Sequence, residues 1–369
     1  MVTVKETHVV KPAEETPSMI MYVSDIDQIN PITHAPTIYF YRPCWDLPLV
    51  LIQLTKFSCG GVSLGLGLSH ILADGQSALH FISEWVRIAR GEGPEYPPFL
   101  DRTVLGYEQE DLLPADFDAS DYKQPPLMIG SLNDIEERTK ETDVLMLKLS
   151  KEQIEKLRSK ANEENKRPGD LDRGFTRFQV VAGHMWRTAC KARKHMETQE
   201  TALKVMVNFR NKVKPSVPKF YFGNAILPVI ASSTAGELVS MPLSYAAGKI
   251  KAATEKVMDG YVKGSAVFLK KQEDLSEWRY LHVVGSKEGT FYGNPNMSIT
   301  SWMTLPNLQG GTDFGWGEED HFGPGAVGYD GKSFILLDRS CSGSVVIALR
   351  LQVTHIQDFE TFFYEDILN

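Results

Sequence analysis

The chain of 369 residues is long enough for two domains with a sizeable core, and its 42% hydrophobic and 23% charged residues are ordinary for a globular protein. The formal net charge of −8 provides no basic field for nucleic acid or anionic lipid, and it tolerates a cationic substrate. No segment approaches the roughly 20 apolar residues that cross a bilayer, and the N-terminus has no leader-like apolar run, so we expect a cytoplasmic protein.

The first predicted elements form a strand-turn-strand-helix unit. Residues 33–43 are aromatic and β-prone, and residues 49–56 and 61–69 read as two strands joined by a Cys59-Gly60-Gly61 turn. From Asp74 onward apolar residues recur every three or four positions, which predicts an amphipathic helix over residues 75–90.

Residues 92–127 are rich in Pro, Asp and Glu and predict a long surface connection, around which we place the domain boundary. Beyond it strands and helices interleave to the end of the chain, which predicts α/β layers without an internal repeat. The predicted strands are 142–150, 201–213, 222–232 and 343–354, and the predicted helical segments are 151–164, 176–193, 238–264 and 358–367.

The sequence places His70 at a strand-to-helix junction, four residues before Asp74. A histidine with a near-neutral pKa can take a proton from an alcohol or amine that attacks an activated carbonyl. Glycines at 65, 67 and 75 allow close approach of backbone or ligand. The alternative is a structural histidine satisfied by hydrogen bonds, and Asp74 can equally anchor the turn through an arginine or backbone N–H groups.

Other catalytic motifs are absent from the sequence. There is no GxSxG, no GxxxxGK[ST] and no sound GxGxxG, so a serine triad, phosphoryl transfer and hydride transfer lack support. The four cysteines are widely spaced and predict neither a disulfide framework nor a metal site. His184 lies in an apolar helical pattern and is expected in the core, and the run Glu318-Glu319-Asp320 is either a solvated loop or a cation-binding site.

The HxxxDG motif is joined far downstream by DFGWG at residues 313–317, and this pair is far more specific than either motif alone. With both motifs the chain resembles the plant BAHD acyltransferases, which use acyl-CoA thioesters, and within them the hydroxycinnamoyltransferase clade. The resemblance covers nearly the whole chain and continues in YFYRP, HFISEWVRIARG, VNFRNKVKPSVPKFYFGNA, SITSW and FFYEDI.

The resemblance implies an α/β fold of two similarly built mixed-sheet domains, like chloramphenicol acetyltransferase, around a central channel. CoA and the acceptor would enter this channel from opposite faces. We expect an N-terminal domain over residues 1–110, a crossover connection over 111–140 and a C-terminal domain over 141–369. It further implies acyl-CoA as co-substrate, no permanently bound cofactor and no metal, and we expect a monomer that binds neither nucleic acid nor membrane.

The resemblance also implies roles for individual residues. His70 would be the general base, Asp74 would hold its loop through Arg210, and Trp302 would donate its indole N–H to the oxyanion, although core packing is the alternative for this tryptophan. Asp313 and Trp316 of DFGWG would be architectural. Thr37, Tyr39 and Thr300 would line the acceptor pocket.

Two departures from the family pattern affect the acceptor and the fold. Members that acylate shikimate carry an arginine handle where this chain has Ser286 or Lys287, and lysine lacks the arginine fork. In addition, family chains are longer by roughly eighty residues, and the shortfall lies between Pro43 and Leu49. The N-terminal domain is therefore expected to be incomplete, with unpaired strand edges and exposed apolar faces.

The amino-acid sequence of residues 33–43 and 313–331 is most similar to that of spermidine hydroxycinnamoyl transferases. The leading hypothesis is transfer of a hydroxycinnamoyl group from CoA to an amine of a polyamine such as spermidine. The alternatives are O-acylation of a shikimate- or quinate-like or phenolic alcohol, and a shortened form that binds ligand or partner without catalysis.

Overall fold

A computed structural model describes residues 5–8, 23–29, 34–35, 49–106, 117–165, 174–275, 289–305, 311–317 and 319–368. The predicted acceptor-pocket residues Thr37 and Tyr39, and the handle positions Ser286 and Lys287, lie outside the described residues. The backbone of His34 and Ala35 is described as strand, and it is the described part of the strand expected over 33–43.

The larger sheet has six strands in the order β4-β9-β8-β7-β5-β6. Its centre is parallel, since β7 pairs in parallel with both β5 and β8, and its other pairs are antiparallel, so the sheet is mixed as predicted. The strands are β4 (Thr142–Leu149), β5 (Glu200–Asn208), β6 (Ile226–Thr234), β7 (Met297–Ser301), β8 (Lys332–Leu337) and β9 (Val345–Gln352).

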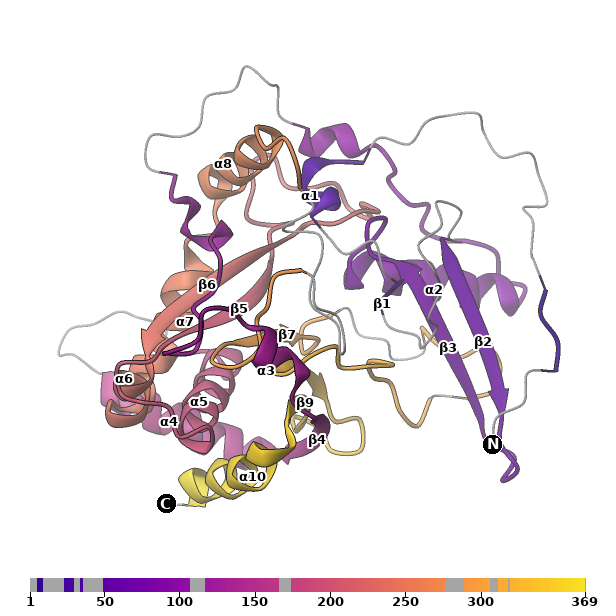
Figure 1. The fold of residues 1–369 in the computed structure, drawn as a ribbon. Helices are drawn as coiled ribbons and strands as arrows, with labels where there is room; N and C mark the ends of the chain where they lie inside the picture. Colours follow the sequence, from indigo (N-terminus) through magenta and orange to yellow (C-terminus); the bar gives the residue numbers. More distant parts are fainter. Residues whose placement is uncertain are drawn as a thin grey trace.

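Helices cover one face of this sheet and gather on one side of it in Figure 1. The main one, α5 (Arg177–Ala192), is capped by Thr176 and buries Trp186 and Met185 completely. Burial of such large apolar side chains is the main stabilising term of the core. Around α5 lie α4 (Lys151–Asn165), α6 (Ala235–Ser240), α7 (Leu243–Glu255) and α10 (Val353–Leu368).

The smaller sheet has the order β1-β3-β2 and is antiparallel. It contains β1 (His34–Ala35), β2 (Val50–Lys56) and β3 (Val62–Ser69), and Gly60 turns the β2–β3 hairpin with a φ of +92°. The predicted hairpin is thus confirmed. Mixed pairing is confined, within the described strands, to the larger sheet.

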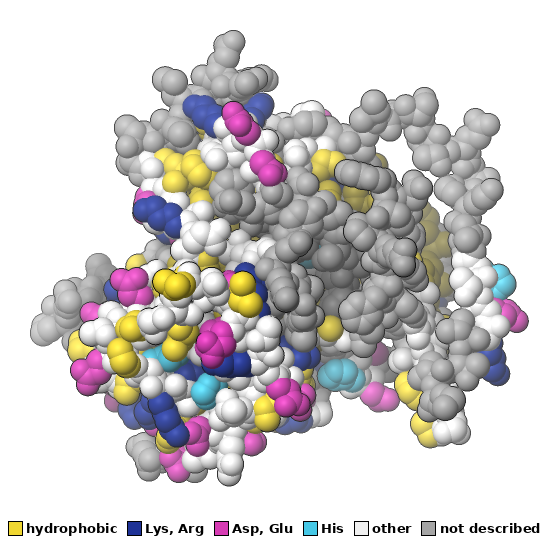
Figure 2. Space-filling model, in the orientation of Figure 1, with side chains coloured by type: hydrophobic (Ala, Val, Ile, Leu, Met, Phe, Trp, Pro, Cys, Tyr) yellow, Lys and Arg dark blue, Asp and Glu magenta, His cyan; other side chains and the backbone are white. Residues whose placement is uncertain are grey.

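The β2–β3 hairpin lies toward the lower right of Figures 1 and 2 and leaves apolar side chains in solvent. Ile52, Leu54 and Val62 are 51%, 49% and 48% exposed, and they lie on one face because Leu54 pairs with Leu64 while Lys56 pairs with Val62. Among the described strands, β2 is also at an edge of its sheet. The expected exposed apolar face and strand edge are confirmed.

Replacing Ile52 and Leu54 together by threonine should improve solubility without loss of stability. Threonine is β-branched, as strands favour, and surface substitutions usually change the free energy of unfolding by no more than about 0.5 kcal/mol. We expect an unchanged Tm and a larger monomer peak in size-exclusion chromatography. Leu68→Thr, on the same face of the hairpin but only 6% exposed, is the matched control and should cost roughly 2 kcal/mol or more. Equal losses for both variants would contradict the exposure of Ile52 and Leu54.

The remaining helices lie before, between and after the strands of the two sheets. They are α1 (Asp25–Gln28), α2 (Gly75–Ala89), η1 (Arg102–Leu105), η2 (Ala119–Tyr122), α3 (Ile135–Thr139) and α8 (Asp259–Lys270). Residues 92–127 were predicted as a surface connection, yet Arg102 and Tyr122 within it are buried. That prediction was wrong for these parts, because side chains of η1 and η2 pack into the interior; the domain limits stay a prediction.

Three further differences separate the predicted elements from the observed ones. β7 and β8 were not predicted. The segment 238–264 belongs to three helices, because the chain turns at Pro242, before α7, and again at Met258, before α8. The last helix, predicted over 358–367, begins at Val353.

Candidate active site

His70 directly follows β3 and precedes the turn that leads into α2. The amide Nδ2 of Asn224 donates a hydrogen bond of 2.8 Å to the His70 backbone carbonyl, which ties the turn to the C-terminal part of the chain. The His70 Nδ1 is buried without a hydrogen-bond partner in the described structure. The His70 side chain lines the cavity described below.

Asp74 caps α2 and binds Arg210 with the same carboxylate. It accepts from the backbone N–H of Ser77 at 3.1 Å, and Arg210 donates to its two oxygens at 2.7 and 2.9 Å. The N–H of Ala225 adds a further bond of 2.9 Å. Because Asp74 is 1% exposed and fully engaged, it does not orient the imidazole of His70; it fixes the turn that carries it.

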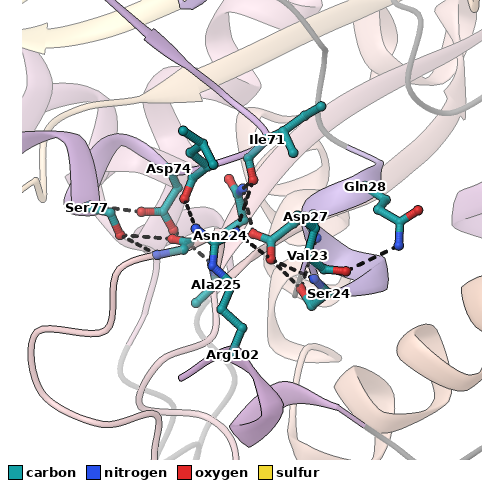
Figure 3. A network of polar contacts seen from close by, with 12 residues as sticks. Val23, Ser24, Asp27, Gln28, Ile71, Asp74, Ser77, Arg102, Asn224 and Ala225 are labelled. Atoms are coloured by element: carbon teal, nitrogen blue, oxygen red, sulfur yellow. Dashed lines mark hydrogen bonds and ion pairs between the residues drawn. The ribbon is translucent and has the colours of Figure 1, made fainter. Parts of the chain in front are cut away.

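A second buried pair, which the sequence analysis missed, supports the same turn (Figure 3). Asp27 accepts from Arg102 Nη1 at 3.2 Å and from the backbone N–H and Nδ2 of Asn224 at 2.8 and 2.9 Å. Arg102 Nη2 donates to the carbonyl of Leu72 at 2.6 Å. Two buried ion pairs from distant segments thus hold residues 70–74, and no local sequence motif marks Asp27, Arg102 or Asn224.

The open face of the larger sheet, β3 and α2 line one cavity of about 1700 Å³. A cavity of this size accommodates substrates larger than a typical drug molecule. The predicted residues His70, Asp74, Arg210, Thr300, Trp302 and Trp316 all contribute to its lining. The structure therefore brings together every predicted site residue that it describes except Asp313.

The pKa of the His70 imidazole is lowered from its usual 6.5, chiefly because the ring is withdrawn from water. The ammonium group of Lys332 acts in the same direction, whereas the backbone of His70, the Asp74 carboxylate and Asn224 oppose the shift. A lowered pKa keeps the imidazole neutral near pH 7, which is the form that accepts a proton.

Trp302 follows β7 and packs between two aromatic rings. Its ring is stacked on Phe322 at 5.2 Å and meets Phe334 edge-on at 5.3 Å, and its backbone N–H donates to the carbonyl of Ile335 at 2.8 Å. No described residue accepts a hydrogen bond from its indole N–H. The ring is thus fixed in the cavity wall with its donor available.

Thr300 and two lysines share the open face of the larger sheet, and the lysines were not singled out from sequence. Ser298 of β7 pairs with Lys204 of β5 on one side and with Lys332 of β8 on the other. Lys332 Nζ donates to Thr300 Oγ1 at 2.6 Å. Burial, with the charge of Lys204, lowers the pKa of Lys332 to about 7, and burial lowers that of Lys204 to about 8.

The DFGWG segment forms a turn at the rim of the cavity. Asp313 Oδ1 accepts from the backbone N–H groups of Gly315 and Gly317 at 2.7 and 2.9 Å, and Phe314 meets Trp85 of α2 edge-on at 4.8 Å. The Asp313 carbonyl accepts from Arg90 at the end of α2 at 2.7 Å. Trp316 is 69% exposed, so it lines the cavity from the rim without packing in a core.

His184 and Glu319, two further candidates from the sequence, are both engaged with other parts of the chain. His184 is buried, its Nε2 lies 2.8 Å from the Phe363 carbonyl, and burial lowers its pKa to about 4, as expected of a core histidine. Glu319 is paired with Arg339. Within the described ranges no three His, Cys, Asp or Glu side chains are placed to hold a metal ion, and no helix is long and apolar enough to cross a membrane.

Comparisons with known proteins agree with this arrangement. The sequence profile described as "Transferase family" matches residues 1–47 and 43–366, in two parts that meet where the missing segment was expected. The chain is 36% identical, over 454 aligned positions covering all of both chains, to hydroxycinnamoyl-CoA:piscidic acid hydroxycinnamoyltransferase of Actaea racemosa. It is 32% identical to shikimate O-hydroxycinnamoyltransferase of Nicotiana tabacum, with 99% of each covered. Since 454 exceeds 369, the first relative contains residues that this chain lacks.

Solved structures with low sequence identity share the fold. F. graminearum TRI101 complexed with coenzyme A and deoxynivalenol matches with a TM-score of 0.67 and 15% identity, over 85% of this chain and 68% of that chain. Vinorine synthase matches with a TM-score of 0.59 and 19% identity, over 95% and 72%. The predicted α/β fold class is confirmed, and the chain belongs to the Transferase family of BAHD acyltransferases.

Proposed function

We propose that this acyltransferase moves a hydroxycinnamoyl group from its CoA thioester to an acceptor bound beside His70. The observation that carries the proposal is that one cavity is lined both by a buried, neutral His70, which follows β3, and by the fixed indole of Trp302, which follows β7. The names of the two relatives supply the acyl group, since both are hydroxycinnamoyltransferases.

The proposed reaction needs only the side chains of the cavity. His70 Nε2 takes the proton of the acceptor hydroxyl or amine as that atom bonds to the thioester carbonyl carbon. The negative charge that develops on the carbonyl oxygen is stabilised by the indole N–H of Trp302. The C–S bond then breaks, CoA leaves as thiolate, and the proton on His70 returns to the sulfur.

The acceptor class is argued from the charges that surround His70. A polyamine was expected from the missing arginine handle and from the similarity of residues 33–43 and 313–331, and the net charge and residues 318–320 agreed with it, but Glu319 already pairs with Arg339. The side chain whose charge acts on His70 beside Asp74 is Lys332, and Lys204 acts on Lys332 in turn. Like charges repel a polycation, so these lysines favour O-acylation of a neutral or anionic alcohol, and the polyamine acceptor stays a prediction with less support.

The direct test is release of CoA thiol from p-coumaroyl-CoA or feruloyl-CoA by the purified 369-residue protein. We expect release that depends on an added acceptor alcohol and exceeds release with spermidine. A soluble protein with a cooperative thermal transition that is raised by the CoA ester, yet shows no release with any acceptor, would replace this proposal by a binding role.

The pH profile provides a separate prediction for His70. Because its pKa is lowered, the acid limb of kcat/KM should have its midpoint below pH 6.5, where the imidazole becomes protonated. Lys332 contributes to that lowering, so Lys332→Met should move the midpoint to higher pH. The measurement is kcat/KM between pH 5 and 8 for both proteins; a midpoint that stays in place or moves to lower pH would contradict the assigned electrostatics.

A further inference from the structure

We propose that Lys204 and Lys332 form an anion site that binds a carboxylate group of the acceptor during acyl transfer. The inference rests on the proposed function and names the substrate class of the same cavity. It assigns specificity to two residues outside the HxxxD and DFGWG motifs.

The two lysines lie on neighbouring strands on either side of β7. Both pair with Ser298 in a parallel register, on either side of β7, so their side chains leave the sheet on the same face. That face lines the cavity, and adjacent strands lie about 4.8 Å apart, so the two Cα atoms are roughly 10 Å apart. Two long side chains at this separation can converge on one carboxylate.

Neither lysine has a protein counter-ion among the described residues. In the described structure neither lysine has a carboxylate partner; Lys332 donates to the neutral Thr300 hydroxyl, and Lys204 lies 4.4 Å from the centre of the Tyr292 ring. Buried cations are ordinarily paired, because removing a charge from water is costly. An anionic ligand would supply the missing charge for both.

Lys332 also lies close to the residues of the proposed reaction. Lys332 reaches along β7 to Thr300, two residues before Trp302, and its charge acts on His70. The phosphates of CoA are separated from the sulfur by the long pantetheine arm, so they cannot lie at the reacting carbonyl. The acceptor is the substrate whose charged group belongs near both His70 and Thr300.

The pH dependence of the free energy of unfolding gives a first test of the two buried lysines. The pKa of each lysine is lower in the folded protein than the usual 10.5, so the unfolded chain binds more protons between about pH 7 and pH 10.5. The free energy of unfolding therefore decreases as the pH falls through this window, because the unfolded chain takes up protons more readily than the folded protein with its buried lysines. Lys332→Met should raise Tm at pH 7 and raise it less at pH 10.

The decisive experiment compares matched acids and esters as acceptors. Shikimate, quinate and malate, each beside its methyl ester, are given with p-coumaroyl-CoA to the wild type, Lys204→Met, Lys332→Met and the double variant, with spermidine as an added arm. We expect at least one acid to exceed its ester by about 10-fold or more in kcat/KM, chiefly through KM, and this ratio to approach one in the double variant. Lys332→Arg should keep part of the acid-to-ester ratio that Lys332→Met loses. Lys160 is an exposed lysine on α4, and Lys160→Met should leave the ratio unchanged.

Thermal shifts at pH 7 with the same acids make the test independent of turnover. An acid that raises Tm of the wild type but not of the double variant supports the site even if no CoA thiol is released, in which case only the proposed function fails. An unchanged acid-to-ester ratio in the double variant, preference for spermidine over every acid, or no thermal shift with any acid would each overturn the site.

Discussion

Replacing His70 by alanine is expected to lower CoA-thiol release by about 10²- to 10⁴-fold, the range in which a positioned general base contributes. The imidazole lies where β3 ends, is held by Asn224 through its backbone, and is kept neutral chiefly by burial. Among the other described histidines, only His321 also lines the cavity. The measurement is kcat with a saturating acceptor, together with Tm.

Two controls separate the loss of the base from a loss of structure. His80→Ala removes a histidine of α2 whose Nε2 lies 2.8 Å from the Tyr96 carbonyl, and it should retain most of the activity. His70→Gln keeps a polar side chain of similar size in the same turn and should be as inactive as His70→Ala. A His70→Gln protein with near wild-type kcat would contradict the role of general base.

Arg210→Met is expected to lower the free energy of unfolding by about 3–5 kcal/mol, because it leaves the buried Asp74 carboxylate without its bidentate partner. Arg210 also donates to Ser77 Oγ at 3.1 Å and to the Gly223 carbonyl at 3.2 Å, so the turn that carries His70 loses several supports at once. Urea unfolding gives the stability, and CoA-thiol release should fall with it.

A double-mutant cycle tests whether the charge pair causes that loss. Asp74→Asn removes the charge but keeps a good N-cap for α2, since asparagine and aspartate cap helices about equally. The double variant Asp74→Asn/Arg210→Met should be less destabilised than the two single losses added together. Lys263→Met, which breaks an exposed i,i+4 pair with Asp259, should cost no more than about 0.5 kcal/mol; strict additivity in the Asp74–Arg210 cycle would contradict a direct interaction.

The position of His70 and the helix after it could be predicted because they depend on local patterns. Alternating small and apolar residues predict β3, apolar residues at three- and four-residue spacing predict α2, and the observed helix ends within one residue of the predicted end. The exposed apolar hairpin was also predictable, since it follows from residues that the chain lacks.

β7 and β8 could not be predicted in the same way. They have five and six residues, and they lie at the parallel centre of the sheet, where partners are far away in sequence. Short strands of this kind carry too few residues for a clear alternation, and their pairing is decided by tertiary contacts. The proposed anion site depends on these strands, so no local sequence pattern marks it.

The sequence by itself determined the family and the fold class, through two motifs that lie far apart in the chain. It also determined the turn that carries His70 and the motif at the cavity rim, because these two depend on residues close together in the chain. Only the tertiary structure decided which charges surround that histidine. Lys204 and Lys332 are 128 positions apart and become neighbours of Ser298 only through the order β5-β7-β8. The net charge agreed with a cationic acceptor, but the field in a buried cavity depends on the charges placed there, and Lys332, on which Lys204 acts in turn, opposes Asp74 at His70.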